Sequence, residues 1–477
     1  MDRGSGTKHG TAQRQERVRV NGHGFQHASV QFSLDDLDHF NPSGGLDLDN
    51  VQGDILLNGL AKKNEIFLFF TINDAKAFCQ KLKAAADEKT HTLHDAFARD
   101  KIAGNSGNGI VPVVGANIAF SFKGLQKMAT VLASLPLQTQ DRAFEAGMKA
   151  AAVSLNDPLK NGSSELVWEA PYLAPQNLHG VILVAGSDDA TCQQKLQKVM
   201  SVFGSSMSEV TRVSGKVRPG ENKGHEQYTA SPSPPSKASI PAAPSRPAKT
   251  PSSPASSSAA GPAWMTDGSF LCFRKLEQKV PEWNQFLVDA SNQLGARLIG
   301  RWKSGCPVSL SPEFDDNNIA ADVNQTNKFD FDAGPFRCPL GAHIRKMTPR
   351  GDLGRATVNQ FRILRRGIPY GDEVDANPTG ERGLLFVCYQ SNIASGFQFL
   401  QQTWANSPGF SQEGSGLDAV MGQSNTEKTV NMKGLFPQDE QKPLALSGVN
   451  RFVVPKGGEY FFTPSMSALR TTLSAVK

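Results

Sequence analysis

The sequence predicts an α+β fold made of two ferredoxin-like halves, whose antiparallel sheets pack together and carry helices on their periphery. Three observations lead to this prediction. The chain has 477 residues, which is more than one small domain needs. A proline-rich segment near its middle separates two apolar regions. Each region contains an apolar strand followed by an amphipathic helix, and then repeats that unit.

Composition sets the expected domain boundaries. Residues 1–45 are polar and lack periodicity, which is typical of a disordered tail. Residues 229–263 contain nine prolines and three charged residues. Repeated proline prevents both helices and sheet ladders, so this segment is expected to be a linker. We therefore expect an N-terminal domain over residues 46–228 and a C-terminal, cofactor-binding domain over residues 264–477.

Two strand–helix units are expected in the N-terminal domain. Residues 66–72 form the first apolar strand, and Asp74 can cap the helix that follows. Residues 180–185 form the next strand. Asp188 then stands at the start of a helix. We expect it to cap this helix and not to form a catalytic pair of carboxylates with the neighbouring Asp189. One face of this helix is apolar, with Leu196, Val199, Met200 and Phe203.

The C-terminal domain repeats the pattern. Residues 269–273 form an apolar strand, and the helical stretch expected after it includes Leu276, Val280, Trp283 and Phe286. Residues 384–389 form another strand, and the helix expected after it presents Ile393, Phe397, Leu400 and Trp404. Strand–helix units occur in many folds, so this pattern alone leaves other α+β architectures open.

Charge and hydropathy exclude several classes of protein. The net charge of +5 is modest for this length and no basic block is present, which argues against a nucleic-acid partner. No apolar run of about 18 residues exists, so an integral membrane protein is excluded. The first 20 residues lack the apolar core of a secretory signal, and six cysteines are dispersed without a CxxC pair. We expect a cytoplasmic protein, with secretion as the alternative.

One histidine stands apart from the other eight. His343 is the only histidine after residue 225, and it follows a loop rich in Gly, Pro and Asp. A lone histidine is usually an ordinary core or surface residue. Zinc would need three or four ligands, and no HxxxH or CxxC pattern supplies them. A haem iron needs a single imidazole from the protein, so His343 is compatible with haem.

Two adjacent arginines follow 22 residues after His343. Arg365 and Arg366 would ordinarily mark a solvated face or a salt bridge. The functional alternative is a guanidinium that binds an anion or a peroxide, because its charge and its donor geometry are fixed. We find no P-loop, no GxGxxG after a strand and no GxSxG nucleophile motif.

Seven segments, in this order along the chain, resemble the fungal dye-decolorizing peroxidases, which are haem enzymes built from two ferredoxin-like domains. The segments are 48–56 (LDNVQGDIL), 217–226 (VRPGENKGHE), 264–271 (WMTDGSFL), 338–346 (CPLGAHIRK), 365–371 (RRGIPYG), 384–390 (LLFVCYQ) and 457–465 (GGEYFFTPS). Together they span residues 46–477 apart from the linker.

The resemblance implies haem b as cofactor and assigns roles to five residues. His343 is expected to bind the iron, and Asp418 to accept the hydrogen bond that fixes its imidazole. Arg365 is expected to polarise the O–O bond of bound peroxide. Leu384 and Phe386 alternate on one strand and could wall the distal pocket, although ordinary core packing is the alternative. Hydrogen peroxide would oxidise a small organic donor that is dye-like, phenolic or a secondary metabolite, and a homodimer is left open.

One family motif is missing. The distal aspartate lies in a Gly-Phe-x-Asp-Gly motif that would follow residues 223–227, where this chain instead runs directly into the linker. Acid–base help of this kind is worth roughly a hundred- to ten-thousandfold in rate. His225 or Glu226 could substitute if the linker folds back. Three alternatives stay open: a gene model that skips an exon, a haem enzyme of specialised metabolism with little peroxidase turnover, and a non-catalytic haem-binding relative.

Overall fold

The structure is a computed structural model that describes most of the chain after residue 48. The described residues are 49–55, 62–87, 93, 114–161, 163–218, 261–289, 291–332, 334–424, 432–434 and 452–477. The predicted tail (1–45) and most of the predicted linker (229–263) lie outside these residues. The boundaries of the two expected domains stay a prediction.

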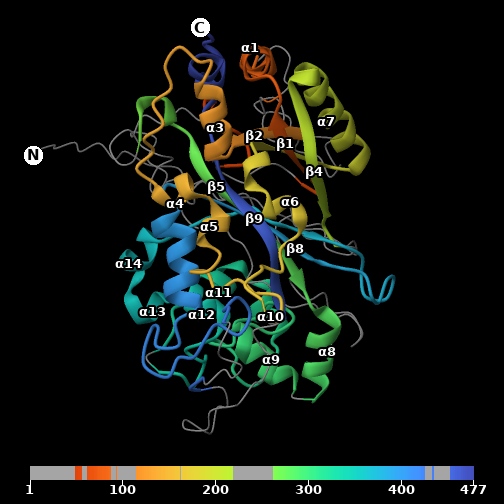
Figure 1. The fold of residues 1–477 in the computed structure, drawn as a ribbon. Helices are drawn as coiled ribbons and strands as arrows, with labels where there is room; N and C mark the ends of the chain where they lie inside the picture. Colours follow the sequence, from red (N-terminus) through yellow and green to blue (C-terminus); the bar gives the residue numbers. More distant parts are fainter. Residues whose placement is uncertain are drawn as a thin grey trace, which may run out of the picture. The chain divides into compact units, whose positions relative to one another are not determined.

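Nine strands form one antiparallel sheet (Figure 1). Their bounds are β1 Asn64–Ile72, β2 Val114–Phe120, β3 Gly180–Gly186, β4 Met207–Lys216, β5 Ser269–Gln278, β6 Leu364–Arg365, β7 Ile368–Tyr370, β8 Gly383–Gln390 and β9 Val453–Thr463.

The α-helices and the shorter 3₁₀- and π-helical segments lie between and after these strands. The α-helices are α1 Ala75–Ala85, α3 Phe122–Ala129, α4 Arg142–Ala146, α5 Met148–Ala151, α6 Ala170–Leu173, α7 Asp189–Phe203, α8 Val280–Asp289, α9 Asn292–Ile299, α10 Asn317–Ala321, α11 Val323–Asn327, α12 His343–Met347, α13 Arg350–Leu353, α14 Arg355–Gln360 and α15 Met466–Arg470. The 3₁₀ segments are η3 Pro175–Asn177, η4 Gly204–Ser206, η5 Ala263–Met265 and η9 Thr472–Ser474, and the π-helical segments are η6 Ala394–Gln398 and η7 Leu400–Ala405.

The strand order confirms the predicted duplication. The sheet runs β4-β1-β3-β2-β9-β5-β8-β6, and β7 pairs with β8 beside β6. If β6 and β7 are counted as one interrupted strand, both halves have the order fourth–first–third–second, which is that of a ferredoxin-like sheet. In the described part of the chain, the ladder between β2 and β9 joins the two halves edge to edge through one pair, Phe120 and Phe462.

The inner faces of the two half-sheets pack together, as predicted. Phe67 and Phe69 of β1 contact Phe273 of β5 with ring centroids 5.2 and 4.8 Å apart. At the far seam, β4 lies against β7, where a Cβ on Gly215 would come within 2.4 Å of Ile368. Only glycine permits this approach. Aromatic side chains therefore fill much of the space between the two half-sheets.

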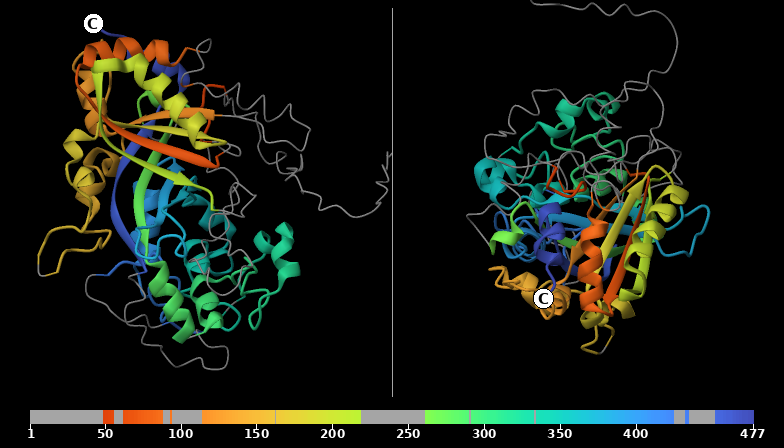
Figure 2. Two further views of the ribbon diagram at one scale, coloured as in Figure 1. Left: turned by 90° about the vertical axis from the view of Figure 1, so that its right-hand side faces the viewer. Right: turned by 90° about the horizontal axis from the view of Figure 1, so that it is seen from above.

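Helices α1 and α7 cover the outer face of the N-terminal half-sheet (Figure 2). Phe78 of α1 stacks on Phe70 of β1 and on Phe203 of α7, with centroids 5.6 and 4.6 Å apart. Asp74 caps α1 by accepting from the backbone N–H of Ala77, and Asp188 caps α7 by accepting from that of Thr191. The two capping predictions are confirmed.

One predicted boundary is wrong. Leu276 was expected in a helix, but β5 continues to Gln278, and Leu276 pairs with Leu384 of β8 and Pro455 of β9. Helix α8 begins only at Val280. An apolar run of this length suits either structure, and pairing with strands more than 100 residues away decides in favour of the strand.

The six cysteines are all free and buried. Among the described residues, none of the helices has the length and apolar character needed to span a bilayer.

Candidate functional site

The candidate site begins at His343, the first residue of α12. Its Nδ1 lies 2.8 Å from Oδ2 of Asp418, whose carboxylate is fully buried. Oδ1 of Asp418 accepts from the backbone N–H groups of Val420 (2.8 Å) and Met421 (2.9 Å). Burial raises the pKa of Asp418, but His343 and these two amides outweigh burial and hold its pKa below the ordinary value. An ionised Asp418 can only accept, so Nδ1 of His343 is the donor, and in the neutral imidazole this leaves the lone pair on Nε2.

Lys346 fastens α12 to the chain segment that leads to Asp418. Its Nζ donates to the carbonyls of Ser407 (2.7 Å), Phe410 (2.8 Å) and Gly416 (2.5 Å). Burial lowers the pKa of Lys346 to about 8. The ammonium has three donors and all three are used, so the segment that carries Asp418 is held against the helix that carries His343.

Strand register places Arg365 on the same face of the sheet as Leu384 and Phe386. Arg365 of β6 is opposite Cys388 of β8, and side chains at even positions of β8 point to one face. Leu384 and Phe386 are half-buried, whereas their odd-numbered neighbours point into the closed interior. Phe386 also packs against the apolar cluster that contains Leu417, Ala419 and Val420. The half-buried face of β8 and the segment around Asp418 therefore belong to one apolar neighbourhood.

A group of cationic side chains lies near Arg365. Burial lowers the pKa of Arg365, although Cys388 partly opposes this effect. Burial, followed by the charges of Arg350 and Arg365, lowers the pKa of Arg301 to about 9. Arg301 and Arg350 both lie over the ring of Phe329, at 5.8 and 5.0 Å from its centroid. The site thus concentrates positive charge in an apolar setting.

Sequence reasoning missed Arg301, Arg350 and Lys346. Arg301 follows the apolar end of α9, and a cation placed directly after an apolar helix is only a weak signal. Lys346 was visible within the CPLGAHIRK segment, but its three acceptors lie 61 to 70 residues further along the chain. His225 and Glu226, named as substitutes for the missing distal aspartate, lie outside the described residues.

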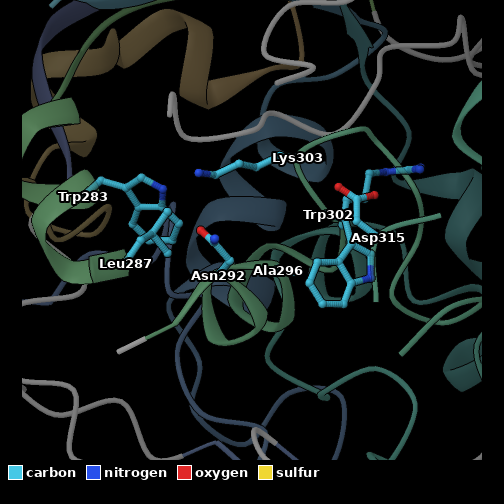
Figure 3. Close-up of a pocket in the computed structure, with 9 residues that line it drawn as sticks. Trp283, Leu287, Asn292, Ala296, Trp302, Lys303 and Asp315 are labelled. Carbon is cyan, nitrogen blue, oxygen red and sulfur yellow. The ribbon is translucent and has the colours of Figure 1, made fainter. Parts of the chain in front are cut away.

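Beside this site, α8, α9 and the segment after α9 enclose a pocket of about 220 Å³ (Figure 3). Trp283, Leu287 and Ala296 form its apolar wall, and Lys303 extends over it toward Trp283. Leu287 and Trp283 belong to the same apolar cluster as Leu417 and Val420. The pocket therefore borders the neighbourhood of Asp418.

Comparison with known proteins gives consistent matches. A family model described as a DyP dimeric alpha+beta barrel domain matches residues 50–219, and a model described as Dyp-type peroxidase, C-terminal, matches residues 246–415. The chain is 37% identical to dye-decolorizing peroxidase msp1 of Mycetinis scorodonius, covering 91% of this chain and 88% of that protein. It is 38% identical to the dye-decolorizing peroxidase of Exidia glandulosa, covering 90% and 88%.

Two solved structures extend these matches. An ancestral D-type dye decolorizing peroxidase is 39% identical, with a TM-score of 0.75, covering 90% of this chain and 99% of that one. A dye-decolorizing peroxidase in complex with 2,6-dimethoxyphenol is 35% identical, with a TM-score of 0.73, covering 90% of this chain and all of that one.

Proposed function

The chain belongs to the dye-decolorizing peroxidase family, a family of haem enzymes that oxidise organic donors with hydrogen peroxide, and from this membership we propose that its cofactor is haem b, bound through Nε2 of His343. Phenols of the size of 2,6-dimethoxyphenol, the compound bound to one of its structural relatives, are the donor class we propose first.

The residues present fit a haem. Nε2 of His343 has no hydrogen-bond partner among the described residues, and a haem iron needs one such nitrogen from the protein. Arg301 is 3% exposed, and its Nε has no partner in the described part of the chain. The same is true of Nε of Arg350. Buried guanidinium donors of this kind suit the two propionates of a haem.

The contact between His343 and Asp418 is the observation that carries the proposal. A buried carboxylate that accepts from Nδ1 fixes the tautomer and makes Nε2 more electron-rich. When bound, haem would supply the redox chemistry, passing two electrons to the peroxide and recovering them from the organic donor. The protein's part on this side is to hold one imidazole in one orientation, and Lys346 and Asp418 do so through five hydrogen bonds besides the His343–Asp418 contact itself.

Arg365 provides the positive charge for the peroxide. We infer that its guanidinium donates to the peroxide oxygen on which negative charge develops as the O–O bond breaks. Its always-protonated donor fork needs no proton transfer to perform this role. Leu384 and Phe386, on the same face of the sheet, would exclude water from the peroxide and keep the local dielectric low.

The missing distal motif supports a second candidate function. Without Gly-Phe-x-Asp-Gly the chain lacks the family's usual proton carrier, so a haem enzyme with slow peroxidase turnover, acting on a small metabolite, is the alternative. A role in secondary metabolism, a homodimer and a cytoplasmic location stay predictions. Sedimentation and cell fractionation test the latter two.

Haem titration tests the proposal. We expect hemin to give a Soret band with the purified chain and a strongly weakened, blue-shifted band with His343→Ala. His179→Ala is the matched control, because the ring of His179 is also held at Nδ1, which accepts from the backbone N–H of Ile72 at 2.8 Å, but His179 lies in the N-terminal half. Equal spectra for His343→Ala and the wild type would refute the assignment of His343.

A further inference from the structure

A buried cluster of titratable side chains lies in the interior of the closed sheet. Asp54 and Glu65 are fully buried, and Lys62 is 5% exposed. Nζ of Lys62 lies 3.3 Å from Oδ1 of Asp54 and 3.1 Å from Oε1 of Glu65. Glu65 is on β1 and points to the same face as Phe67 and Phe69, which is the inner face. Burying three titratable side chains together is costly, whichever of them carry charge.

Lys62 reaches from the N-terminal half to the backbone beside Arg365. Its Nζ donates to the carbonyl of Arg366 at 2.8 Å. The side chain of Arg366 returns to the N-terminal half, where its Nε donates to the carbonyl of Asp54 at 2.9 Å. The backbone N–H of Arg366 donates to the carbonyl of Val387 on β8. The carbonyl, the amide and the side chain of this one residue are therefore all held.

Arg366 lies at the interruption of the edge strand, between β6 and β7. Arg366 and Gly367 separate β6 from β7, and β6 itself is only two residues long. So short a strand has few ladder hydrogen bonds with which to fix its own position. The guanidinium of Arg365, on the other face of the sheet, makes no hydrogen bond to any of the described residues. The position of Arg365 consequently depends on the backbone that Lys62 and Arg366 hold.

We propose that Lys62 is a positioning residue for Arg365, acting across the sheet through the carbonyl of Arg366, with Asp54 and Glu65 holding its ammonium in place. The proposal rests on the role of Arg365 in peroxide binding given above. A displacement of about 1 Å in a catalytic group can cost about a hundredfold in rate. Through this cluster the N-terminal half influences the reaction, although it contributes no other named residue to the site.

Lys62→Met tests the proposal, because methionine keeps the length of the side chain but cannot donate. Gln52→Met is the matched control. Gln52 is also buried and also ties the two halves, donating to the carbonyls of Ile118 and Pro464 at 3.0 and 2.7 Å, but it lies at the other seam, where β2 meets β9. If the single variant folds poorly, the double variant Lys62→Met/Glu65→Gln takes its place, because it also removes one of the two carboxyl groups that Lys62 contacts.

Two readouts are needed, one of them without haem. In the haem-free chain, hydrogen exchange should become at least tenfold faster for peptides that span residues 364–370 in Lys62→Met, and stay unchanged there in Gln52→Met. In the haem-loaded chain, the affinity for fluoride and the rate constant for the reaction with peroxide should both fall about ten- to a hundredfold in Lys62→Met. In Gln52→Met, both should stay within twofold of the wild-type values.

The outcomes separate the two claims. If Arg365→Leu weakens fluoride binding but Lys62→Met, or the double variant, does not, the positioning role is wrong while the role of Arg365 stands. If hydrogen exchange accelerates in Lys62→Met but neither Lys62→Met nor Arg365→Leu changes the affinity for fluoride, the proposed role of Arg365 is wrong. Equal effects of Lys62→Met and Gln52→Met would reduce Lys62 to a general stabilising residue and overturn the inference.

Discussion

The surroundings of His343 and those of Arg365 differ in how their polar groups are partnered. Around His343, Asp418 and Lys346, each carboxylate oxygen and each ammonium donor has a partner at 2.5 to 2.9 Å. Around Arg365, the guanidinium makes no hydrogen bond to the described residues, and two half-buried apolar side chains share its face. Where a side chain must be held in one orientation, all its polar partners are used in hydrogen bonds within the protein. Where a reactant must bind, hydrogen-bond donors are left unpartnered by the protein.

The largest expected effect comes from removing the unpartnered donor. Arg365→Leu should lower the rate constant for the reaction with peroxide about a hundred- to a thousandfold, because charge that develops on the leaving oxygen loses its stabilising partner. Haem affinity should change little. Stopped-flow spectroscopy with peroxide measures the first quantity and hemin titration the second. If Arg365→Leu bound haem weakly but reacted with peroxide at the normal rate once loaded, Arg365 would serve to hold the cofactor and not to receive the peroxide.

A smaller effect is expected on the saturated side. Asp418→Asn keeps the shape of the side chain but removes the negative charge that Nδ1 of His343 donates to. Partners of this kind are worth about ten- to a hundredfold in metal affinity or activity, so haem affinity should fall by that amount. Dissociation of haem to an apoprotein acceptor measures the change. Unaltered dissociation in Asp418→Asn would mean that the pair with His343 is structural only.

The last expected effect is a pH dependence of stability. Burial raises the pKa of Glu65 to about 8, although Lys62 opposes the shift. The unfolded chain releases this proton near 4.5 and the folded chain keeps it until about 8, so stability falls as pH rises between these values. The slope cannot exceed about 1.4 kcal/mol per pH unit for one proton.

Glu65→Gln tests this dependence. Urea denaturation from pH 5 to pH 8 should give a shallower decline of the free energy of unfolding in Glu65→Gln than in the wild type. Some decline should persist, because burial also raises the pKa of Glu459 to about 7. Identical slopes in the two proteins would show that Glu65 is ionised in the folded state throughout this range.

Much of the fold is predictable from the sequence, because strands in the core read as apolar runs with a capped helix after them. The error at Leu276 arises because a short apolar run suits either a strand or a helix, and only its distant partners on β8 and β9 decide. The site could be predicted from one isolated histidine and from a set of motifs in a fixed order. The cations that support it were not accessible in this way, because Lys346 donates to backbone carbonyls 61 to 70 residues away and Lys62 reaches the carbonyl of Arg366, 304 residues away.

A crystal structure of the haem-loaded chain is the decisive experiment for the roles of His343 and Arg365. We expect that Nε2 of His343 would hold the iron, with Nδ1 still paired to Asp418, and that the guanidinium of Arg365 would line the pocket that receives the peroxide. A protein ligand to the iron other than His343, or a guanidinium of Arg365 outside that pocket, would contradict these assignments.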